Sequence, residues 1–241
     1  MTDSTPPVPI DGILSEEIEE IVSRRSQEIV ANLGVVTDRI VAAGGDPQGV
    51  RVVGVTKTFD WVTALAARRV GIEDLGENYA NELVNKAQSL AQVVPSVPTR
   101  WHYLGDLQRN KINRLAPHVA LFQGIDRLEE GEALAQRSPG AHLLVEVALT
   151  ESATRGGVPL ARVAGLVEQL SSLDLVVDGL MAVAPLDDAS AALPHFHQVA
   201  NLAAELGLHE ISMGMSEDLE MAVAAGSTMV RIGRALFGSR A

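Results

Sequence analysis

Residues 52–58 read Val-Val-Gly-Val-Thr-Lys-Thr, a short run of mostly β-branched, apolar side chains that reaches Lys57. Such a run is typical of a buried strand. From there to residue 237, short apolar runs alternate with stretches of helical periodicity. An uninterrupted alternation of strands and helices predicts a parallel sheet covered by helices.

The apolar runs predict eight strands, at residues 51–56, 72–75, 101–104, 119–123, 142–148, 175–183, 210–213 and 228–232. Helical periodicity predicts helices at 61–70, 77–92, 108–115, 127–137, 159–171, 189–206 and 216–225, with a short one at 234–237. Eight strands alternating with helices indicate an α/β fold, a single (β/α)8 TIM-type barrel. A doubly wound open sheet is the alternative, but no Gly-x-Gly-x-x-Gly turn follows the first strand.

The N-terminal part of the chain adds one helix to this pattern. Residues 1–14 are Pro-rich and are expected to be flexible. Ser15 is expected to cap a helix that runs from Glu16 to about Ala43. We find no linker that divides residues 15–241, because the stretch 95–98 is best interpreted as a loop before the third strand. The extra helix and the barrel are therefore predicted to form one domain.

Composition and charge exclude several classes of function. The 241 residues carry a formal net charge of −12 and include no cysteine. An acidic chain is a poor partner for nucleic acid or an anionic membrane, although a few amides and arginines can still bind a small anion. Without cysteine, disulfides, thiolate catalysis and cysteine-ligated metals are excluded. His195 and His197 lie two apart on a predicted helix and face different ways, so no metal site is expected. With no signal peptide and no run of about 18 apolar residues, we expect a soluble, cytoplasmic protein.

In a barrel of this kind, the residues at the carboxyl ends of the strands gather around one mouth. The residues that the predicted strands bring toward this mouth, and that are candidates for function, are Lys57, Glu77, Asn78, His102, Met213, Ser216, Arg231 and Gly233. Their convergence at one end is stronger evidence for a site than any one of them.

Lys57 is the most informative of these residues. An amine at the end of a buried strand loses part of its solvation, which lowers its pKa and makes it a nucleophile that can form a Schiff base with an aldehyde. The alternative is a lysine that begins a loop and points into water.

The loops after the seventh and eighth strands form the usual phosphate site of this architecture. Ser216 and Gly233 are the candidates there, and the alternative for Ser216 is a plain helix N-cap. Glu217 and Asp218 must point outward for such a site to work.

The remaining candidates also have structural alternatives. Arg231 lies within an apolar strand and needs a partner in the barrel, unless it is a surface residue at the strand end. His102 points inward or is a packed core histidine. Glu77 and Asn78 line the mouth or cap the next helix. A lysine, an arginine and a phosphate site suit pyridoxal 5′-phosphate (PLP) or, equally, a phosphorylated sugar bound by a Schiff-base aldolase.

Five segments give the chain a close resemblance to a known family: VVGVTKT (52–58), DLGENYANELVNKA (74–87), WHYLGDLQRNKIN (101–113), GLMAVAP (179–185) and ISMGMSEDLEMAVAAGSTMVRIGRALFG (211–238). The chain resembles the pyridoxal phosphate homeostasis proteins, which are related to the barrel domain of bacterial alanine racemase.

Apart from Glu77, the resemblance implies a role in PLP binding for each candidate residue. It implies that Lys57 carries the Schiff base and that Arg231 faces the pyridine nitrogen. Ser216, Gly233 and Thr228 are implied to hold the phosphate, Asn78 and His102 to line the site, and Met213 to pack the pocket. The chain departs from the family pattern at Phe59-Asp60, Asp106, Arg109, Glu146 and a longer loop at 151–158. Of these, Glu146 lies near the expected cofactor face.

Two functions remain after this comparison. The resemblance favours a protein that binds, buffers and delivers PLP; the alternative is a small PLP-dependent amino-acid racemase. An arginine against the ring nitrogen keeps that nitrogen unprotonated, which makes the ring a weaker electron sink. Racemisation also requires an acid–base group on each face of the substrate, and the related racemases take the second from another domain, for which this chain has no room. We therefore expect a monomer that hands PLP to apo-enzymes, with any second base among Tyr79, Tyr103 and His102.

Overall fold

The structure, a computed structural model, describes residues 14–93, 99–150, 156–184 and 192–239. Several predictions fall wholly or partly outside this range. They are the flexible segment at 1–14, the loop at 95–98, the first part of the loop at 151–158 and the start of the helix at 189–206.

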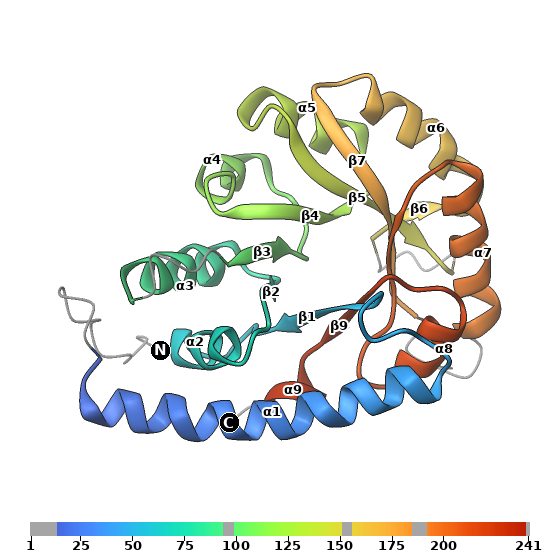
Figure 1. The fold of residues 1–241 in the computed structure, drawn as a ribbon. Helices are drawn as coiled ribbons and strands as arrows, with labels where there is room; N and C mark the ends of the chain where they lie inside the picture. Colours follow the sequence, from blue (N-terminus) through green and yellow to red (C-terminus); the bar gives the residue numbers. More distant parts are fainter. Residues whose placement is uncertain (1–13, 94–98, 151–155, 185–191, 240–241) are drawn as a thin grey trace.

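Eight parallel strands close into a barrel (Figure 1). In chain order they are β1 (Arg51–Val55), β2 (Asp74–Glu77), β3 (Arg100–Tyr103), β4 (Val119–Ile125), β5 (Ala141–Ala148), β7 (Leu175–Ala182), β8 (Glu210–Ser212) and β9 (Met229–Ile232). Pairing of β1 with β9 and of β4 with β5 closes the ring. A two-residue strand, β6 (Val158–Pro159), pairs with β5 beside the ring and was not predicted. The predicted (β/α)8 barrel is confirmed.

Helices surround the barrel on its outer side (Figure 1). They are α2 (Trp61–Arg69), α3 (Ala80–Val93), α4 (Ile112–Leu115) after a 3-10 turn η1 (Arg109–Lys111), α5 (Leu128–Arg137), α6 (Leu160–Ser171), α7 (Ala192–Glu205), α8 (Leu219–Ala224) and α9 (Arg234–Phe237). Their apolar faces and the outer faces of the strands form one aliphatic core.

The second strand begins two residues later than predicted, at Asp74 instead of residue 72. The reason is a Schellman motif at the end of α2. The Gly71 N–H donates to Arg68 O at 3.1 Å, and the Ile72 N–H donates to Ala67 O at 3.1 Å, with Gly71 at φ +88°. Ile72 is buried as the apolar residue that accompanies such a cap, so its hydrophobicity belongs to the helix end.

The additional N-terminal helix, α1 (Glu16–Ala42), lies outside the barrel along α2, α9 and α8 (Figure 1). The predicted cap is confirmed, because Ser15 Oγ accepts a hydrogen bond from the Ile18 N–H at 3.3 Å. Two side chains of α1 reach the last parts of the barrel. Asn32 Nδ2 donates to Leu236 O at 2.9 Å, and Arg39 Nη2 donates to Ser216 O at 2.9 Å. The helix therefore contacts the loop at Ser216 and α9, the helix that follows the turn at Gly233.

Candidate functional site

A cavity of about 750 Å³ opens at the carboxyl ends of the barrel strands. It has the size of a typical small-molecule site. The structure brings five of the predicted residues to its wall, namely Lys57, Asn78, Ser216, Arg231 and Gly233. The expected convergence of these residues at one mouth of the barrel is confirmed.

Lys57 lies between two threonines that are both fixed by hydrogen bonds. Thr56 Oγ1 donates to Glu77 Oε1 at 2.6 Å, and the Thr58 N–H donates to Glu82 Oε2 at 2.8 Å. Thr58 has φ +68°, an unusual conformation for a residue with a β-branched side chain. Anchors on both sides fix the backbone that carries Lys57, whose own side chain is half-buried at the cavity.

A buried ion pair holds these anchors together. Lys86 Nζ on α3 donates to Glu77 Oε1 at 2.6 Å, to Thr56 O at 2.8 Å and to Glu82 Oε2 at 3.1 Å. Burial raises the pKa of Glu77 and outweighs the charge of Lys86. Glu77 is the last residue of β2, and its carboxylate bonds to Thr56 and Lys86 and to no backbone N–H of α3, so it is not the helix cap that was its alternative. Sequence reasoning missed Lys86, although its i,i+4 spacing from Glu82 on a predicted helix was visible.

Arg231 is buried in β9 with three hydrogen bonds. Its Nη1 donates to Ser212 O and to Ser212 Oγ, both at 2.7 Å, and its Nη2 donates to Ala182 O at 2.9 Å. Burial lowers the pKa of Arg231 to about 10, which leaves it cationic at neutral pH. The expectation that an arginine in an apolar strand has partners inside the barrel is confirmed.

Glu146, near the end of β5, faces the same cavity. Burial, and then the charge of Asp126, raise the pKa of Glu146 to about 7, although Arg231 acts in the opposite direction. A carboxyl group with this pKa changes charge near neutral pH. The departure from the family pattern at this position therefore lies in the cavity wall.

The loop after β8 and the turn after β9 form one side of the cavity. Ser216 Oγ accepts a hydrogen bond from the Ala235 N–H at 3.3 Å, so Ser216 joins the two segments and does not cap α8. Glu217 forms an ion pair with Arg234 and is 71% exposed, as a phosphate site requires. Asp218 is buried, with Oδ1 accepting from the Met215 N–H at 2.5 Å. The expectation that both acidic side chains point outward is therefore correct for Glu217 and wrong for Asp218.

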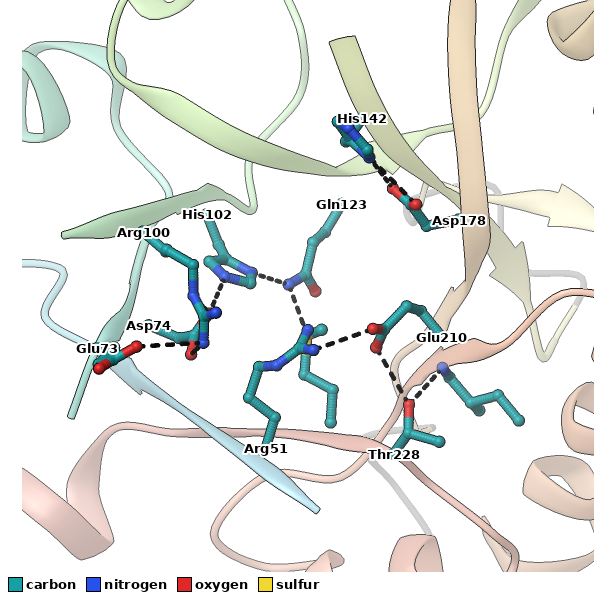
Figure 2. Close-up of polar contacts among 12 residues, drawn as sticks. Arg51, Glu73, Asp74, Arg100, His102, Gln123, His142, Asp178, Glu210 and Thr228 are labelled. Carbon is teal, nitrogen blue, oxygen red and sulfur yellow. Dashed lines mark hydrogen bonds and ion pairs between the residues drawn. The ribbon is translucent and has the colours of Figure 1, made fainter. Parts of the chain in front are cut away.

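Three predicted residues lie away from the cavity. His102 is buried in the barrel interior, between Asp74 and Gln123 (Figure 2). Thr228 precedes β9 and its Oγ1 accepts a hydrogen bond from the Ile211 N–H at 2.9 Å (Figure 2). Met213 is fully buried in the core. The structure does not bring these three residues to the wall that Lys57 and Arg231 share.

Within the described ranges, no helix is both long and apolar enough to span a bilayer. In the same part of the chain, no group of three or more His, Asp or Glu side chains is arranged to hold a metal ion.

The fold first defines the class of this protein. The model of the alanine racemase N-terminal domain family matches residues 25–241. An alanine racemase of Clostridium difficile 630 superposes with a TM-score of 0.72 at 13% identity, over 88% of this chain and 57% of the racemase, which shows the fold alone.

Sequence relatives then define the family. A pyridoxal phosphate homeostasis protein of Pseudomonas aeruginosa is 35% identical over 225 residues, which cover 88% of this chain and 96% of the relative. One of Escherichia coli K12 is 33% identical over 88% of this chain and 97% of its own. PipY of Synechococcus elongatus PCC7942, solved with PLP bound, superposes with a TM-score of 0.74 at 30% identity, over 84% of this chain and 100% of PipY. This chain belongs to the family of pyridoxal phosphate homeostasis proteins.

Proposed function

We propose that the cavity binds pyridoxal 5′-phosphate and that the protein holds, buffers and delivers this cofactor. The observation that carries the proposal is the shared cavity wall of Lys57, Arg231, Ser216 and Gly233. This donor set fits an anionic aldehyde, because it offers an amine, a guanidinium, a hydroxyl and a glycine turn around one volume. The names of the relatives and the PLP-bound PipY structure support the same ligand.

Each residue of this set has a proposed role. The Lys57 amine condenses with the ligand's aldehyde carbon, and water leaves as the Schiff base forms. Ser216 and the turn at Gly233 bind the phosphate, and Arg231 donates to the pyridine nitrogen. Asn78 contacts the ligand from the loop after β2. When bound, PLP supplies an aldehyde that amines take up reversibly and a ring that can accept electrons.

The residues of the cavity favour delivery over racemisation. Arg231 stays protonated at neutral pH, so it supports an unprotonated ring nitrogen and a weak electron sink. Burial, and then Asp106, raise the pKa of Tyr103 to about 12, and its hydroxyl donates to Asp106 O at 3.1 Å. A phenol held in this way is a poor base for a second face of a substrate. Delivery to apo-enzymes by a cytoplasmic monomer completes the proposal.

The direct test compares Lys57→Ala with Lys111→Ala, because Lys111 also lines the cavity. Protein incubated with PLP is examined by absorbance, then reduced with borohydride and mapped by mass spectrometry. We expect the wild type and Lys111→Ala to carry a reduced adduct on Lys57, and Lys57→Ala to carry none. An adduct of undiminished yield in Lys57→Ala contradicts the proposed role of Lys57.

Turnover is tested on loaded protein by exchange of amino-acid α-protons in D2O, followed by NMR. We expect no exchange above that of free PLP for L- or D-amino acids, together with reactivation of an apo PLP enzyme by the loaded protein. Exchange that requires Lys57 would instead make this protein a racemase, with its second base to be sought at Tyr79, which is 56% exposed at the cavity.

A further inference from the structure

A line of hydrogen bonds crosses the interior of the barrel from Arg231 to Asp74. Arg231 Nη1 donates to Ser212 Oγ at 2.7 Å, and Ser212 Oγ donates to Gln123 Oε1 at 2.7 Å. Gln123 Nε2 lies 2.6 Å from His102 Nδ1, and His102 Nε2 lies 2.8 Å from Asp74 Oδ1. Figure 2 shows the part of the line from Gln123 through His102 to Asp74.

The line runs through an apolar interior. Its members are at most 5% exposed, and an aliphatic cluster fills the barrel around them: Val53, Leu121, Leu144, Met181 and Met229. Buried polar groups are costly unless they are hydrogen-bonded, so each member depends on its neighbours in the line. Removing one member therefore disturbs the next one along.

All bonds of the line have the same direction. Gln123 Oε1 accepts from Ser212, so its amide nitrogen faces His102, and that nitrogen also donates to Met229 Sδ at 3.1 Å. His102 Nδ1 must then accept, and the ring proton lies on Nε2, where it is donated to Asp74. Every donor in the line consequently points away from Arg231 and toward the carboxylate.

The far end of the line is fixed at the amino-terminal ends of the strands. Arg100 donates to Asp74 through Nε at 3.0 Å and through Nη2 at 2.5 Å (Figure 2). Burial alone would raise the pKa of Asp74, but the hydrogen bonds from His102 and Arg100 outweigh it and hold the pKa below its ordinary value. Asp74 is therefore a carboxylate that accepts and cannot donate.

We propose that Ser212, Gln123 and His102 are positioning residues that fix the orientation of Arg231 toward the ligand. The proposal rests on the proposed function, in which Arg231 contacts the pyridine nitrogen. The bonds to Ser212 O, Ser212 Oγ and Ala182 O use three of the five N–H groups of the guanidinium. The remaining two are the ones available to a ligand in the cavity that Arg231 lines. His102 thus serves the site through the line, without lining the cavity.

The first test uses the cofactor-free wild type. ¹⁵N NMR of the histidine side chains, assigned by comparison with His102→Gln, reports which ring nitrogen carries the proton. We expect the proton of His102 on Nε2, with Nδ1 unprotonated, at neutral pH. A proton on Nδ1 would overturn the proposal, because Gln123 could not then donate to His102 while accepting from Ser212.

The second test breaks the line at two points and compares the cavity. Ser212→Ala removes the hydroxyl next to Arg231, and Gln123→Met removes the amide while keeping the side-chain length. We expect each variant to bind PLP about fivefold to tenfold more weakly and to shift the absorbance of the bound cofactor. His142→Asn is the matched control, because His142 lies at the same end of the barrel as Asp74 and bonds only to Asp178 among the described residues. Folded Ser212→Ala with the affinity and spectrum of the control would overturn the proposal, whether or not Gln123→Met folds.

A third readout separates this proposal from the proposed function. The guanidinium N–H signals of Arg231, assigned with Arg231→Lys, are recorded in cofactor-free protein. In Ser212→Ala we expect them to broaden as rotation of the guanidinium becomes faster, while they stay sharp in His142→Asn. Failure of the wild type to bind PLP would reject the proposed function alone, and unchanged Arg231 signals in Ser212→Ala would reject the line alone.

Discussion

The two ends of this barrel carry similar charged residues but pair them differently. At the amino-terminal ends of the strands (the lower end), the arginines that begin β1 and β3 each bond to a carboxylate: Arg51 to Glu210 at 3.1 Å and Arg100 to Asp74 at 2.5 Å (Figure 2). At the carboxyl ends (the upper end), Arg231 bonds to two carbonyls and a hydroxyl instead. Glu146 at that end makes no hydrogen bond to another described residue.

This difference in the partners of the arginines explains why the carboxyl ends of the strands can form an anion-binding site. A cation whose partner is a carboxylate has its charge largely balanced before any ligand arrives. A cation held by neutral dipoles keeps its charge for an anion, and its burial strengthens the interaction. The lower end encloses a cavity of about 670 Å³, so volume alone does not distinguish the two. Pairing does.

The largest expected effect on stability comes from breaking the buried ion pair between Lys86 and Glu77, next to Lys57. Lys86→Met leaves the Glu77 carboxylate buried without its cation, so we expect the free energy of unfolding to fall by about 3–5 kcal/mol. Urea denaturation followed by circular dichroism measures the change.

Two further variants give this experiment its controls. Lys111→Met changes the same residue type at the cavity mouth and should alter stability by less than about 0.5 kcal/mol. The double variant Lys86→Met/Glu77→Gln should recover more than half of the loss, because no charge is then left unpaired. A Lys86→Met protein as stable as Lys111→Met would show that the pair does not support the end of β1.

Glu146→Gln tests the unpaired acid of the upper end. The pKa of Glu146 is raised from an ordinary 4.5 to about 7, so the folded chain binds this proton more tightly than the unfolded chain. Its contribution to stability is greatest below about pH 4.5 and is lost as the pH rises toward 7. The Gln variant has no such loss, so its stability relative to wild type should increase by about 1–3 kcal/mol between pH 4.5 and 8.

Denaturation at a series of pH values measures this difference. Glu217→Gln, an exposed acid at the same mouth, should follow the wild-type profile. Parallel profiles for Glu146→Gln and wild type would mean that Glu146 titrates normally. The same series with PLP present should show wild-type affinity declining through pH 7 more steeply than that of Glu146→Gln, because the deprotonated carboxylate repels an anion.

Part of the contrast between the two ends of the barrel was visible in the sequence. Lys57 and Arg231 stand out because each is a charged residue next to or within an apolar strand. Gln123 carries the same signal, a polar residue in the predicted strand 119–123, and was overlooked. The strands themselves were predicted to within about two residues because their apolar runs are short and separated by helical periodicity.

The rest depends on contacts between distant segments. The Lys86 network joins β2, α3 and Thr56, the residue that follows β1, and no single window of sequence shows that Lys86 turns inward. His102 and Thr228 belong to family motifs, but which end of the barrel a side chain serves depends on its position along the strand. The strand β6 is two residues long, too short for any periodicity.

Arg39→Met tests whether α1 supports the upper end. Arg39 donates to Ser216 O at 2.9 Å and to Glu220 at 2.6 and 2.8 Å, so it ties α1 to the predicted phosphate loop. The pair is partly exposed, so we expect a stability loss of only about 1 kcal/mol. PLP binding should weaken about threefold, as measured by fluorescence titration. Arg69→Met is the control. It removes the ion pair between Arg69 on α2 and Glu19 on α1, which lies away from the Ser216 loop, and it should leave PLP affinity unchanged. Equal affinities in the two variants would limit α1 to a role in packing.

The smallest effect is expected at an exposed ion pair of the lower end. His142 pairs with Asp178 at 2.9 Å, but its side chain is 53% exposed, so water screens the interaction. His142→Asn should therefore change the unfolding free energy by less than about 0.5 kcal/mol and leave PLP affinity unaltered.

Asp74→Asn, at the same end but buried, should weaken PLP binding, because it weakens the acceptor at which the line from Arg231 ends. If both variants left PLP affinity unchanged, the lower end would stabilise the barrel without influencing the site. If His142→Asn weakened it as much as Asp74→Asn, the influence would come from the charge of the whole lower end and would not depend on the line.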